Sequence, residues 1–416
     1  MKVATMSENR EKRVTRRNVL KTGAGGAMGG WLAAAGLTGS EGRAEDPMPN
    51  VYDTLGVKPF INAAGTITTM GGSIMPPEVV AAWQAASRHF VDLRELQDRV
   101  GERIAELCRV EAALVTTGAA GAILLGTAAA VTHRDEGLIA CLPVDPALGL
   151  QVVSQKSHRL CYDRQVEATG AKIIEVETRA ELEAVLDDKT VMMMAYNVRE
   201  TAGKIKRQEW IEVARKNNIP TLLDAAADTP PVDALWKYND MGYDLVVFSG
   251  GKALRGPQDG GLLLGRKNLI EAAKRNTSPY CPTIGRGMKV SKEDMVAMWA
   301  AVERFVGMDA SAEWREWERR IEAIESSLQR VPTVTTQRIV PPIANSVPHL
   351  LVFWDENELG ISRSEVTSKL RDGEPSIRLA RVSGTGSEGL LISVFMLQPG
   401  EDKIIGDRLR QILSRE

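Results

Sequence analysis

One stretch of the sequence decides both fold and chemistry: Asp244-Leu-Val-Val-Phe-Ser-Gly-Gly-Lys252-Ala-Leu-Arg-Gly-Pro-Gln-Asp-Gly-Gly-Leu-Leu-Leu264. The apolar runs from Leu245 to Phe248 and from Gly261 to Leu264 are typical of buried strands, and the Ser-Gly-Gly turn after the first run presents a lysine. Burial disfavours the ammonium form of Lys252 and leaves more free amine, the form that attacks a carbonyl carbon. The stretch therefore predicts a Schiff-base lysine; the alternative is a surface lysine after a strand.

A carboxylate upstream supplies a partner for this lysine. Thr221-Leu-Leu-Asp224 is a short apolar run that ends on an acid, one strand-helix-strand excursion before Lys252. Pyridoxal phosphate chemistry needs such an acid beside the ring nitrogen, because a protonated pyridinium draws electrons from the substrate carbon. Asp228 is a rival for this role, but it follows the apolar run by a turn, so Asp224 is preferred.

The two segments together resemble the aspartate and lysine strands of fold-type I pyridoxal phosphate enzymes. The wording Phe248-Ser-Gly-Gly-Lys-x-Leu-x-Gly-Pro-Gln-x-Gly260 is similar, more narrowly, to bacterial selenocysteine synthases and D-glucosaminate-6-phosphate ammonia-lyase-like enzymes. The resemblance implies a lyase that acts by α,β-elimination, or β-replacement, on an amino acid or amino sugar acid through a Lys252 Schiff base. The alternatives are a seryl-tRNA selenium transferase-like or aminotransferase-like enzyme and a catalytically inert pyridoxal phosphate-binding protein.

The surrounding chain alternates strands and helices from 112 to 264, which predicts an α/β fold. We expect a mostly parallel sheet of the seven-stranded type, with helices on both faces. Residues 45–110 form an N-terminal arm and helices, 111–290 the large cofactor-binding domain, 291–330 one linking helix, and 331–416 a small α+β domain with two helices over an antiparallel sheet. The run 137–143 is expected to be a further strand.

A turn of small residues is the expected phosphate site. Thr117, Gly118, Ala119 and Ala120 lie between a predicted strand and a predicted helix, where small side chains, a hydroxyl and the unpaired N–H groups of a helix start suit an anion. Ser249 adds a hydroxyl from the lysine turn. Tight strand-helix packing is the alternative reason for small residues here.

The resemblance implies further cofactor contacts. Fold-type I enzymes usually stack a flat side chain on the cofactor ring from the region of His158, whose alternative is a surface histidine. An amide or hydroxyl near the position of Asn197 touches the ring oxygen in related folds.

Three residues are candidates for the substrate side. Asn62 and Thr66 belong to an N-terminal arm that lies near the active-site mouth in the resembled family, although the arm could instead dock on a partner subunit. Arg286 offers a planar guanidinium for a substrate carboxylate or phosphate, or is a solvated loop arginine.

The N-terminus is expected to be an export signal. Thr15-Arg16-Arg17-Asn-Val-Leu-Lys21 matches the twin-arginine pattern, a Gly/Ala-rich run too short to anchor in a bilayer follows, and Ala44 ends a possible cleavage site. This predicts recognition by the twin-arginine machinery, a periplasmic protein and no stable membrane anchor. A disordered basic tail is the alternative.

The composition of the chain limits the kinds of binding partner that we expect. The 416 residues carry 52 basic and 54 acidic side chains, so no basic field is present to hold nucleic acid. The four cysteines show no metal-ligand spacing, so no metal is expected, and Cys141 and Cys161 are interpreted as core thiols, with a disulfide as the alternative. The expected partner is a small-molecule amine substrate, bound by a homodimer or higher homo-oligomer.

Overall fold

The computed structural model describes residues 50–380 and 389–414. By its internal contacts the chain divides into residues 1–58 and Pro59–Glu416. The described part of the first unit is helix α2 (Val51–Thr54), capped by Asn50, whose side chain accepts a hydrogen bond from the Tyr52 amide at 3.1 Å. The predicted twin-arginine segment lies outside the described residues, and all other described helices and strands belong to the second unit.

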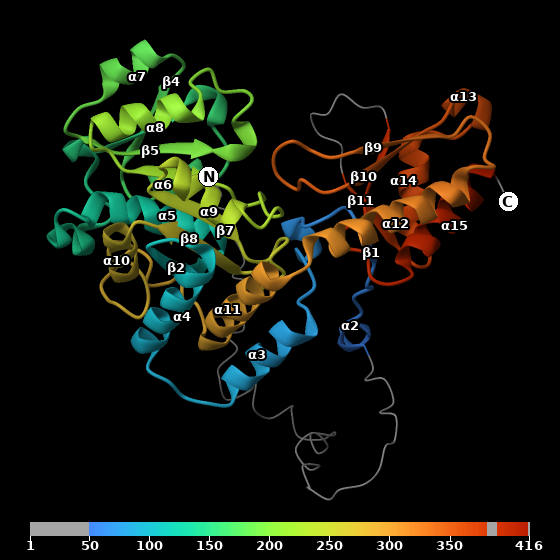
Figure 1. The fold of residues 1–416 in the computed structure, drawn as a ribbon, viewed down its shortest axis with the longest axis horizontal. Helices are drawn as coiled ribbons and strands as arrows, with labels where there is room; N and C mark the ends of the chain where they lie inside the picture. Colours follow the sequence, from blue (N-terminus) through green and yellow to red (C-terminus); the bar gives the residue numbers. More distant parts are fainter. Residues whose placement is uncertain (1–49, 381–388, 415–416) are drawn as a thin grey trace, which may run out of the picture. The chain divides into compact units, whose positions relative to one another are not determined.

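A seven-stranded sheet forms the centre of the large domain (Figure 1). Its strands, in spatial order, are β2 (Ala112–Thr117), β8 (Gly260–Gly265), β7 (Leu245–Ser249), β6 (Thr221–Asp224), β5 (Thr190–Tyr196), β3 (Gln151–Gln155) and β4 (Lys172–Val176). Strand β8 runs antiparallel to both of its neighbours, and all other pairs are parallel. The predicted mostly parallel seven-stranded sheet is confirmed.

Both faces of this sheet are apolar and covered by helices, because its strands alternate their side chains between two hydrophobic cores. In β7, Val246 and Phe248 enter one core, whereas Leu245 and Val247 enter the other. The first core is covered by α4 (Leu93–Cys108), α7 (Arg179–Val185), α8 (Arg207–Lys216), α9 (Ala234–Met241) and α11 (Lys292–Gly307). The second is covered by α5 (Gly118–Thr132), α6 (Asp163–Glu167) and α10 (Lys267–Arg275).

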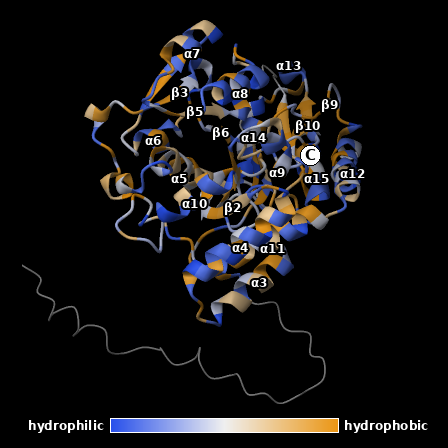
Figure 2. Ribbon diagram, turned by 60° about the vertical axis from the view of Figure 1, so that its left-hand side comes forward, coloured by the Kyte–Doolittle hydropathy of each residue, from blue (hydrophilic) through white to orange (hydrophobic). Residues whose placement is uncertain are grey.

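A separate core gathers the C-terminal elements. They are α12 (Ala310–Leu328), β9 (Thr335–Ile339), β10 (His349–Phe353), α13 (Glu356–Leu359), α14 (Arg363–Asp372), β11 (Ile377–Leu379), β12 (Leu390–Ser393) and α15 (Glu401–Ser414). Strands β12, β10 and β9 form the expected small antiparallel sheet. Figure 2 shows β10 in hydrophobic colours, whereas the solvent-facing helix α8 is largely hydrophilic.

The remaining elements are short or peripheral. Strand β1 (Ile61–Ala63) pairs in parallel with β11. The prediction that β11 belongs to the small antiparallel sheet was therefore wrong. Helix α3 (Pro77–Ser87) packs on α11 through Val79. The 3-10 turns are η1 (Thr68–Met70), η2 (Glu136–Cys141), η3 (Pro146–Leu148), η4 (Lys156–His158) and η5 (Asn197–Arg199).

Two predicted elements were wrong. The linking helix 291–330 is two helices, because Asp309 caps a new helix by accepting hydrogen bonds from the amides of Ser311 and Ala312, both at 3.0 Å. The predicted strand 137–143 is the 3-10 helix η2, started by Asp135, whose side chain accepts from the Gly137 amide at 2.9 Å. Both errors are missed aspartate caps.

The cysteine interpretation also needs correction. Cys141 and Cys161 are exposed rather than core thiols, since the strand expected around Cys141 is a solvent-facing turn. Only Cys108 of the four is buried, and burial raises its pKa to about 12. Within the described ranges, no helix has the length and apolarity to cross a bilayer, and no cluster of three potential metal ligands occurs.

Candidate active site

The carboxyl ends of four parallel strands bring the predicted cofactor residues to one edge of the sheet. Tyr196 pairs with Asp224 across β5 and β6, so Asn197 and Asp224 follow neighbouring strand ends. Ser249 ends β7 opposite Gly261, and Thr117 ends β2 opposite Gly260. Ligands of parallel sheets bind at this edge.

Lys252 lies in the loop between β7 and β8, at this edge. The loop is closed by a hydrogen bond from the Gly250 amide to the Gly260 carbonyl at 2.8 Å. Burial lowers the pKa of Lys252, and the carboxylates of Asp224 and Asp228 oppose that shift. Because burial has the larger effect, Lys252 retains more free amine than a solvated lysine, which is the form that a nucleophile needs.

Asp224 is a buried carboxylate, and one of its two oxygens accepts a backbone hydrogen bond. Its Oδ1 accepts a hydrogen bond from the Ala226 amide at 2.8 Å, and the residue is 9% exposed. Burial raises the pKa of Asp224 to about 6, although the Ala226 amide and Lys252 act in the opposite direction. A positively charged ring nitrogen would offset this cost of burying a charge.

The start of α5 has the features of an anion site. Gly118 adopts a positive φ of 66°, and the Thr117 Oγ1 atom is buried without a hydrogen-bond partner among the described residues. A Cβ on Gly261 would lie 2.3 Å from the Gly118 carbonyl carbon, so the glycines allow β8 to approach the turn. No acidic side chain occupies the first helical turn. The unpaired hydroxyl and the helix start fit a phosphate group.

These residues together fit pyridoxal phosphate. The Thr117 hydroxyl and the first turn of α5 would hold the phosphate, Asp224 would face the ring nitrogen, and Lys252 would meet the aldehyde carbon. The individual cofactor contacts of Ala119, Ala120 and Ser249 remain predictions.

Asn197 belongs to a buried polar network. Its Nδ2 donates to Asp228 Oδ2 at 2.6 Å and to the Tyr238 hydroxyl at 3.0 Å, while its Oδ1 accepts from Arg207. Tyr238 and Arg207 come from two different helices and were not predicted from the sequence. The contact of Asn197 with the ring oxygen remains a prediction.

His158 is fully buried in η4. Its Nδ1 accepts from the Tyr196 amide at 3.3 Å, and burial, with Arg199, Arg207 and Lys206 nearby, lowers its pKa to about 4. The ring is therefore neutral at pH 7, and its stacking role remains a prediction. A second flat side chain from the same region was missed: Tyr162 is 44% exposed, and partial burial, with smaller effects of Cys161 and Asp224, raises its pKa.

The N-terminal arm contacts the lysine loop of its own chain. Gln258 donates to the Thr68 carbonyl at 2.8 Å, and a Cβ on Gly72 would lie 2.5 Å from the Gly251 carbonyl oxygen. Both polar atoms of the Asn62 amide form hydrogen bonds within the arm. The Nδ2 atom donates to the Gly65 carbonyl and the Oδ1 atom accepts from the Ala64 amide, each at 3.0 Å.

The other two substrate-side candidates are less confined. Thr66 is half-buried in the arm, whereas Arg286 is exposed in a turn that follows α10. Substrate contacts of Asn62, Thr66 and Arg286 remain predictions.

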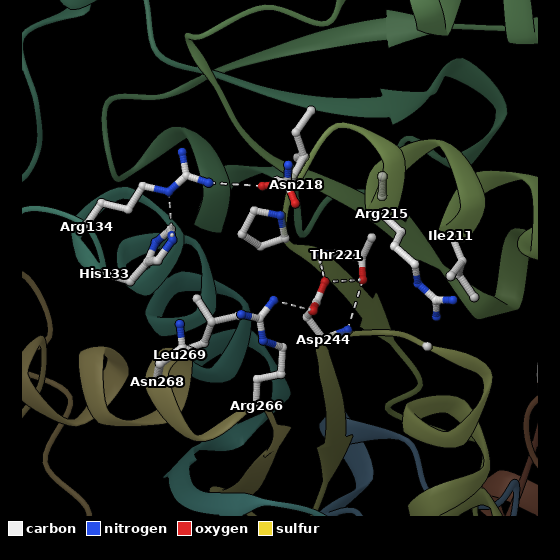
Figure 3. Close-up of a pocket in the computed structure, with 14 residues that line it drawn as sticks. His133, Arg134, Ile211, Arg215, Asn218, Thr221, Asp244, Arg266, Asn268 and Leu269 are labelled. Carbon is white, nitrogen blue, oxygen red and sulfur yellow. Dashed lines mark hydrogen bonds and ion pairs between the residues drawn. The ribbon is translucent and has the colours of Figure 1, made fainter.

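A hollow of about 480 Å³ lies at the opposite edge of the sheet (Figure 3). There Asp244 ties the start of β7 to that of β6, since its Oδ2 accepts from the Thr221 amide at 2.8 Å while its Oδ1 accepts from Arg266 at 2.9 Å. Arg134 is likewise engaged, with the Asn218 carbonyl at 3.0 Å. None of the predicted cofactor residues lines this hollow.

Comparisons with known proteins agree with this site. The family Aminotransferase class-V matches residues 154–340. A D-glucosaminate-6-phosphate ammonia lyase from Salmonella typhimurium is 29% identical over 380 residues, covering 88% of this chain and 98% of the relative. A solved structure of D-glucosaminate-6-phosphate ammonia-lyase superposes with a TM-score of 0.76 at 28% identity and covers 88% of this chain and 99% of that structure.

A more partial relative is an L-seryl-tRNA(Sec) selenium transferase from Hyphomonas neptunium, 29% identical over 59% of this chain and 56% of the relative. With the fold and the site, these similarities define the chain as a pyridoxal phosphate-dependent enzyme of fold-type I. Within that class it is related to D-glucosaminate-6-phosphate ammonia lyase and, over a shorter stretch, to the selenium transferases.

Proposed function

We propose that the protein is a lyase that releases ammonia from an amino acid or amino sugar acid by α,β-elimination. The observation that carries this proposal is a similarity to D-glucosaminate-6-phosphate ammonia lyase along 98% of that enzyme, combined with a half-buried lysine and a buried carboxylate at one sheet edge. Bound pyridoxal phosphate supplies an electron sink for the bond cleavage at the substrate carbon.

The residues of the chain divide the remaining work. The first turn of α5 would hold the phosphate, and Asp224 would keep the proton on the ring nitrogen. Lys252, with its Nζ free, would accept the proton from the substrate α-carbon. The β-hydroxyl would take up a proton and leave as water, and hydrolysis of the resulting enamine, through its imine form, would yield the keto acid and ammonia. The burial that lowers the pKa of Lys252 keeps a fraction of Nζ unprotonated for this step.

Ammonia and keto-acid release from a panel of amino acids and amino sugar acids tests this proposal. We expect both products in equal amounts from at least one amino sugar acid, and none from Lys252→Ala. Transfer of the amino group to a keto-acid acceptor without free ammonia would instead identify an aminotransferase, and a loaded protein without turnover on the panel would identify an inert binder.

We also propose export by the twin-arginine machinery to the periplasm, supported by Arg16 and Arg17 ahead of a Gly/Ala-rich run. This route carries folded proteins, so the cofactor would be inserted in the cytoplasm. Fractionation of cells that express the full chain tests the proposal: Arg16→Lys with Arg17→Lys should leave the protein in the cytoplasm. Equal periplasmic amounts of the double variant and wild type would refute it.

A homo-oligomer is the proposed assembly, since fold-type I sites are generally shared across a dimer. Light scattering of the purified protein distinguishes a dimer or larger assembly from a monomer, and a monomer that is fully active would contradict the proposal.

A further inference from the structure

A larger hollow, of about 1130 Å³, lies between the N-terminal arm, the start of α14, β11 and β12. Its size is sufficient for a small organic molecule. None of the predicted cofactor residues lines it, so it is separate from the site around Lys252. The described residues that line it include three arginines, Arg363, Arg371 and Arg378, and a single acid, Glu356.

Two of these arginines have no partner for their charge. Within residues 50–380 and 389–414, the guanidinium groups of Arg363 and Arg378 form no hydrogen bond or ion pair, and Arg363 Nη1 and Arg378 Nε are buried. Arg371, by contrast, donates two hydrogen bonds to the Asp372 carboxylate, each at 2.7 Å. A buried donor without an acceptor is costly, and a guanidinium is always charged. The two unpaired side chains therefore favour an anion as the occupant of the hollow.

Regular structure holds both unpaired arginines in place. Arg363 is the first residue of α14, whose start is capped by Ser362, and Arg378 is the middle residue of β11, which pairs with β1. The Arg378 guanidinium lies over the Phe60 ring, 5.5 Å from its centroid. Both side chains are half-buried. The positive charge of the hollow is therefore positioned before any ligand arrives.

Hydroxyl groups supply further donors in the hollow. Ser364 and Ser368 lie one turn apart on α14, Thr69 lies on the arm, and all three line the hollow without a side-chain hydrogen bond among the described residues. Glu356 is exposed, and it accepts a hydrogen bond from the backbone amide of Arg363 at 2.9 Å rather than from its guanidinium. Phosphate and carboxylate oxygens accept hydrogen bonds from both guanidinium and hydroxyl groups. The donors therefore match an acid group of a ligand.

The arm connects this hollow with the lysine loop. Residues of the arm segment 67–70 line the hollow. In the same segment, the Thr68 carbonyl accepts a hydrogen bond at 2.8 Å from Gln258, which belongs to the loop that carries Lys252. An occupant of the hollow would therefore contact the same arm segment that binds the lysine loop.

We propose that this hollow binds a small organic anion whose phosphate or carboxylate groups pair with Arg363 and Arg378. The binding itself is independent of the lyase assignment. The role of the anion rests on the proposed function: it is the acid end of the amine substrate or a second molecule that contacts the arm. Both sources offer the same chemistry to the arginines, and kinetics distinguish them.

Calorimetric titration of the full-length, pyridoxal phosphate-loaded protein with 6-phosphogluconate tests the site. This probe carries a phosphate and a carboxylate but no amine, so it cannot release ammonia, and the bound cofactor makes the phosphate turn of α5 unavailable to it. We expect wild type to bind the probe. Arg363→Gln and Arg378→Gln should each weaken binding about tenfold, because each removes a charge-assisted contact.

Arg371→Gln is the matched control, because Arg371 lines the same hollow but is already paired with Asp372. Its affinity for the probe should stay within about twofold of wild type. No binding by wild type, an unchanged affinity in both Arg363→Gln and Arg378→Gln, or an equal loss in the control would overturn the proposal. Since the two arginines belong to different elements, one variant tests the site if the other fails to fold.

A second measurement uses the loaded wild type alone. Phenylglyoxal modifies guanidinium groups, and peptide mass spectrometry reports the modification of each arginine. The probe should reduce modification of Arg363 and Arg378 several-fold and leave Arg88, which is exposed at the end of α3, unchanged. Equal modification of Arg363 and Arg378 with and without the probe would also contradict the proposal.

The kinetics of ammonia release identify the source of the anion. If it is the acid end of the substrate, the probe should compete with substrate, and Arg363→Gln should raise KM. If it is a second molecule, the probe should change kcat without competing. Both patterns support the site. The calorimetry needs no turnover, so a failure of the lyase proposal would leave its result standing, and absence of probe binding would leave the lyase proposal intact.

Discussion

The chemistry of Lys252 and Asp224 depends on their partial removal from water near the ends of two neighbouring strands. Burial shifts the pKa of each group toward its uncharged form, and the proximity of the two groups partly offsets both shifts. A site arranged in this way favours a ligand that brings a positive charge to Asp224 and a carbonyl to Lys252.

The pH dependence of folding tests the burial of Asp224. In the cofactor-free protein its pKa of about 6 exceeds the ordinary value of 3.8, so the folded state retains a proton that the unfolded chain releases between these values. This group therefore makes folding less favourable as the pH rises from about 4 to about 6. Relative to Asp224→Asn, the wild type should lose on the order of 2 kcal/mol of unfolding free energy across that window.

Urea unfolding of both cofactor-free proteins at several pH values measures this difference. The change in the difference with pH is the relevant quantity, because it removes the pH-independent effects of the substitution. A constant difference would show that the Asp224 carboxyl titrates normally.

The positions of Asp224 and Lys252 could be predicted because Asp224 ends one apolar strand and Lys252 lies in the short turn that follows another. The network of Asn197, Asp228, Tyr238 and Arg207 could not, since its members come from a 3-10 turn, a loop and two helices. Only the packing of α8 and α9 on the sheet brings them together, and no local spacing records it. Tyr162 was missed for the same reason.

Among the elements, the contact between β8 and the start of α5 shapes the predicted phosphate site. Gly261→Ala would place a Cβ 2.3 Å from the Gly118 carbonyl carbon, and both atoms belong to rigid elements. We expect a loss of about 1–3 kcal/mol of stability and weaker cofactor binding. Denaturant unfolding and a cofactor titration measure the two effects.

Gly287→Ala is the control for this substitution, because a Cβ there has no neighbour within 4 Å and Gly287 has no positive φ. Its stability should stay within about 0.5 kcal/mol of wild type. If Gly261→Ala is equally neutral, the close approach of β8 to the phosphate turn is not required.

Element prediction succeeded where hydrophobic pattern and length agree. The apolar runs around 221–224, 245–249 and 260–265 are strands because each is too short for a buried helix and is bounded by turn residues. The run 137–143 was wrongly predicted to be a strand because it is as apolar as these three runs. Asp135 instead caps a 3-10 helix there. Likewise the Gly307-Met-Asp309 sequence contains both a helix stop and a helix cap.

For the whole molecule, cofactor binding should be linked to folding. A ligand that binds only the folded state stabilises it, by about 2.7 kcal/mol at a concentration of one hundred times its dissociation constant. Added pyridoxal phosphate should therefore raise the thermal unfolding midpoint of stripped wild type in a concentration-dependent way. The rise should be smaller in Lys252→Ala, which retains only the non-covalent contacts. Equal rises in both proteins would mean that Lys252 does not take part in holding the cofactor.

Sequence periodicity predicted the large domain well because its sheet is built from local strand-helix repeats. Contacts between segments that are distant in the sequence could not be predicted from periodicity. Strand β1 pairs with β11, which lies near the other end of the chain, and Ala253 packs into the C-terminal core. These contacts depend on the folded molecule as a whole, and no local pattern encodes them.

The most direct test of the account is the site of covalent cofactor attachment. Borohydride reduction of the loaded protein, followed by peptide mass spectrometry, should find the pyridoxyl mass on Lys252, and Lys252→Ala should carry none. A tag on another lysine, or no tag in a protein that retains the bound cofactor, would contradict the central claim that Lys252 holds pyridoxal phosphate.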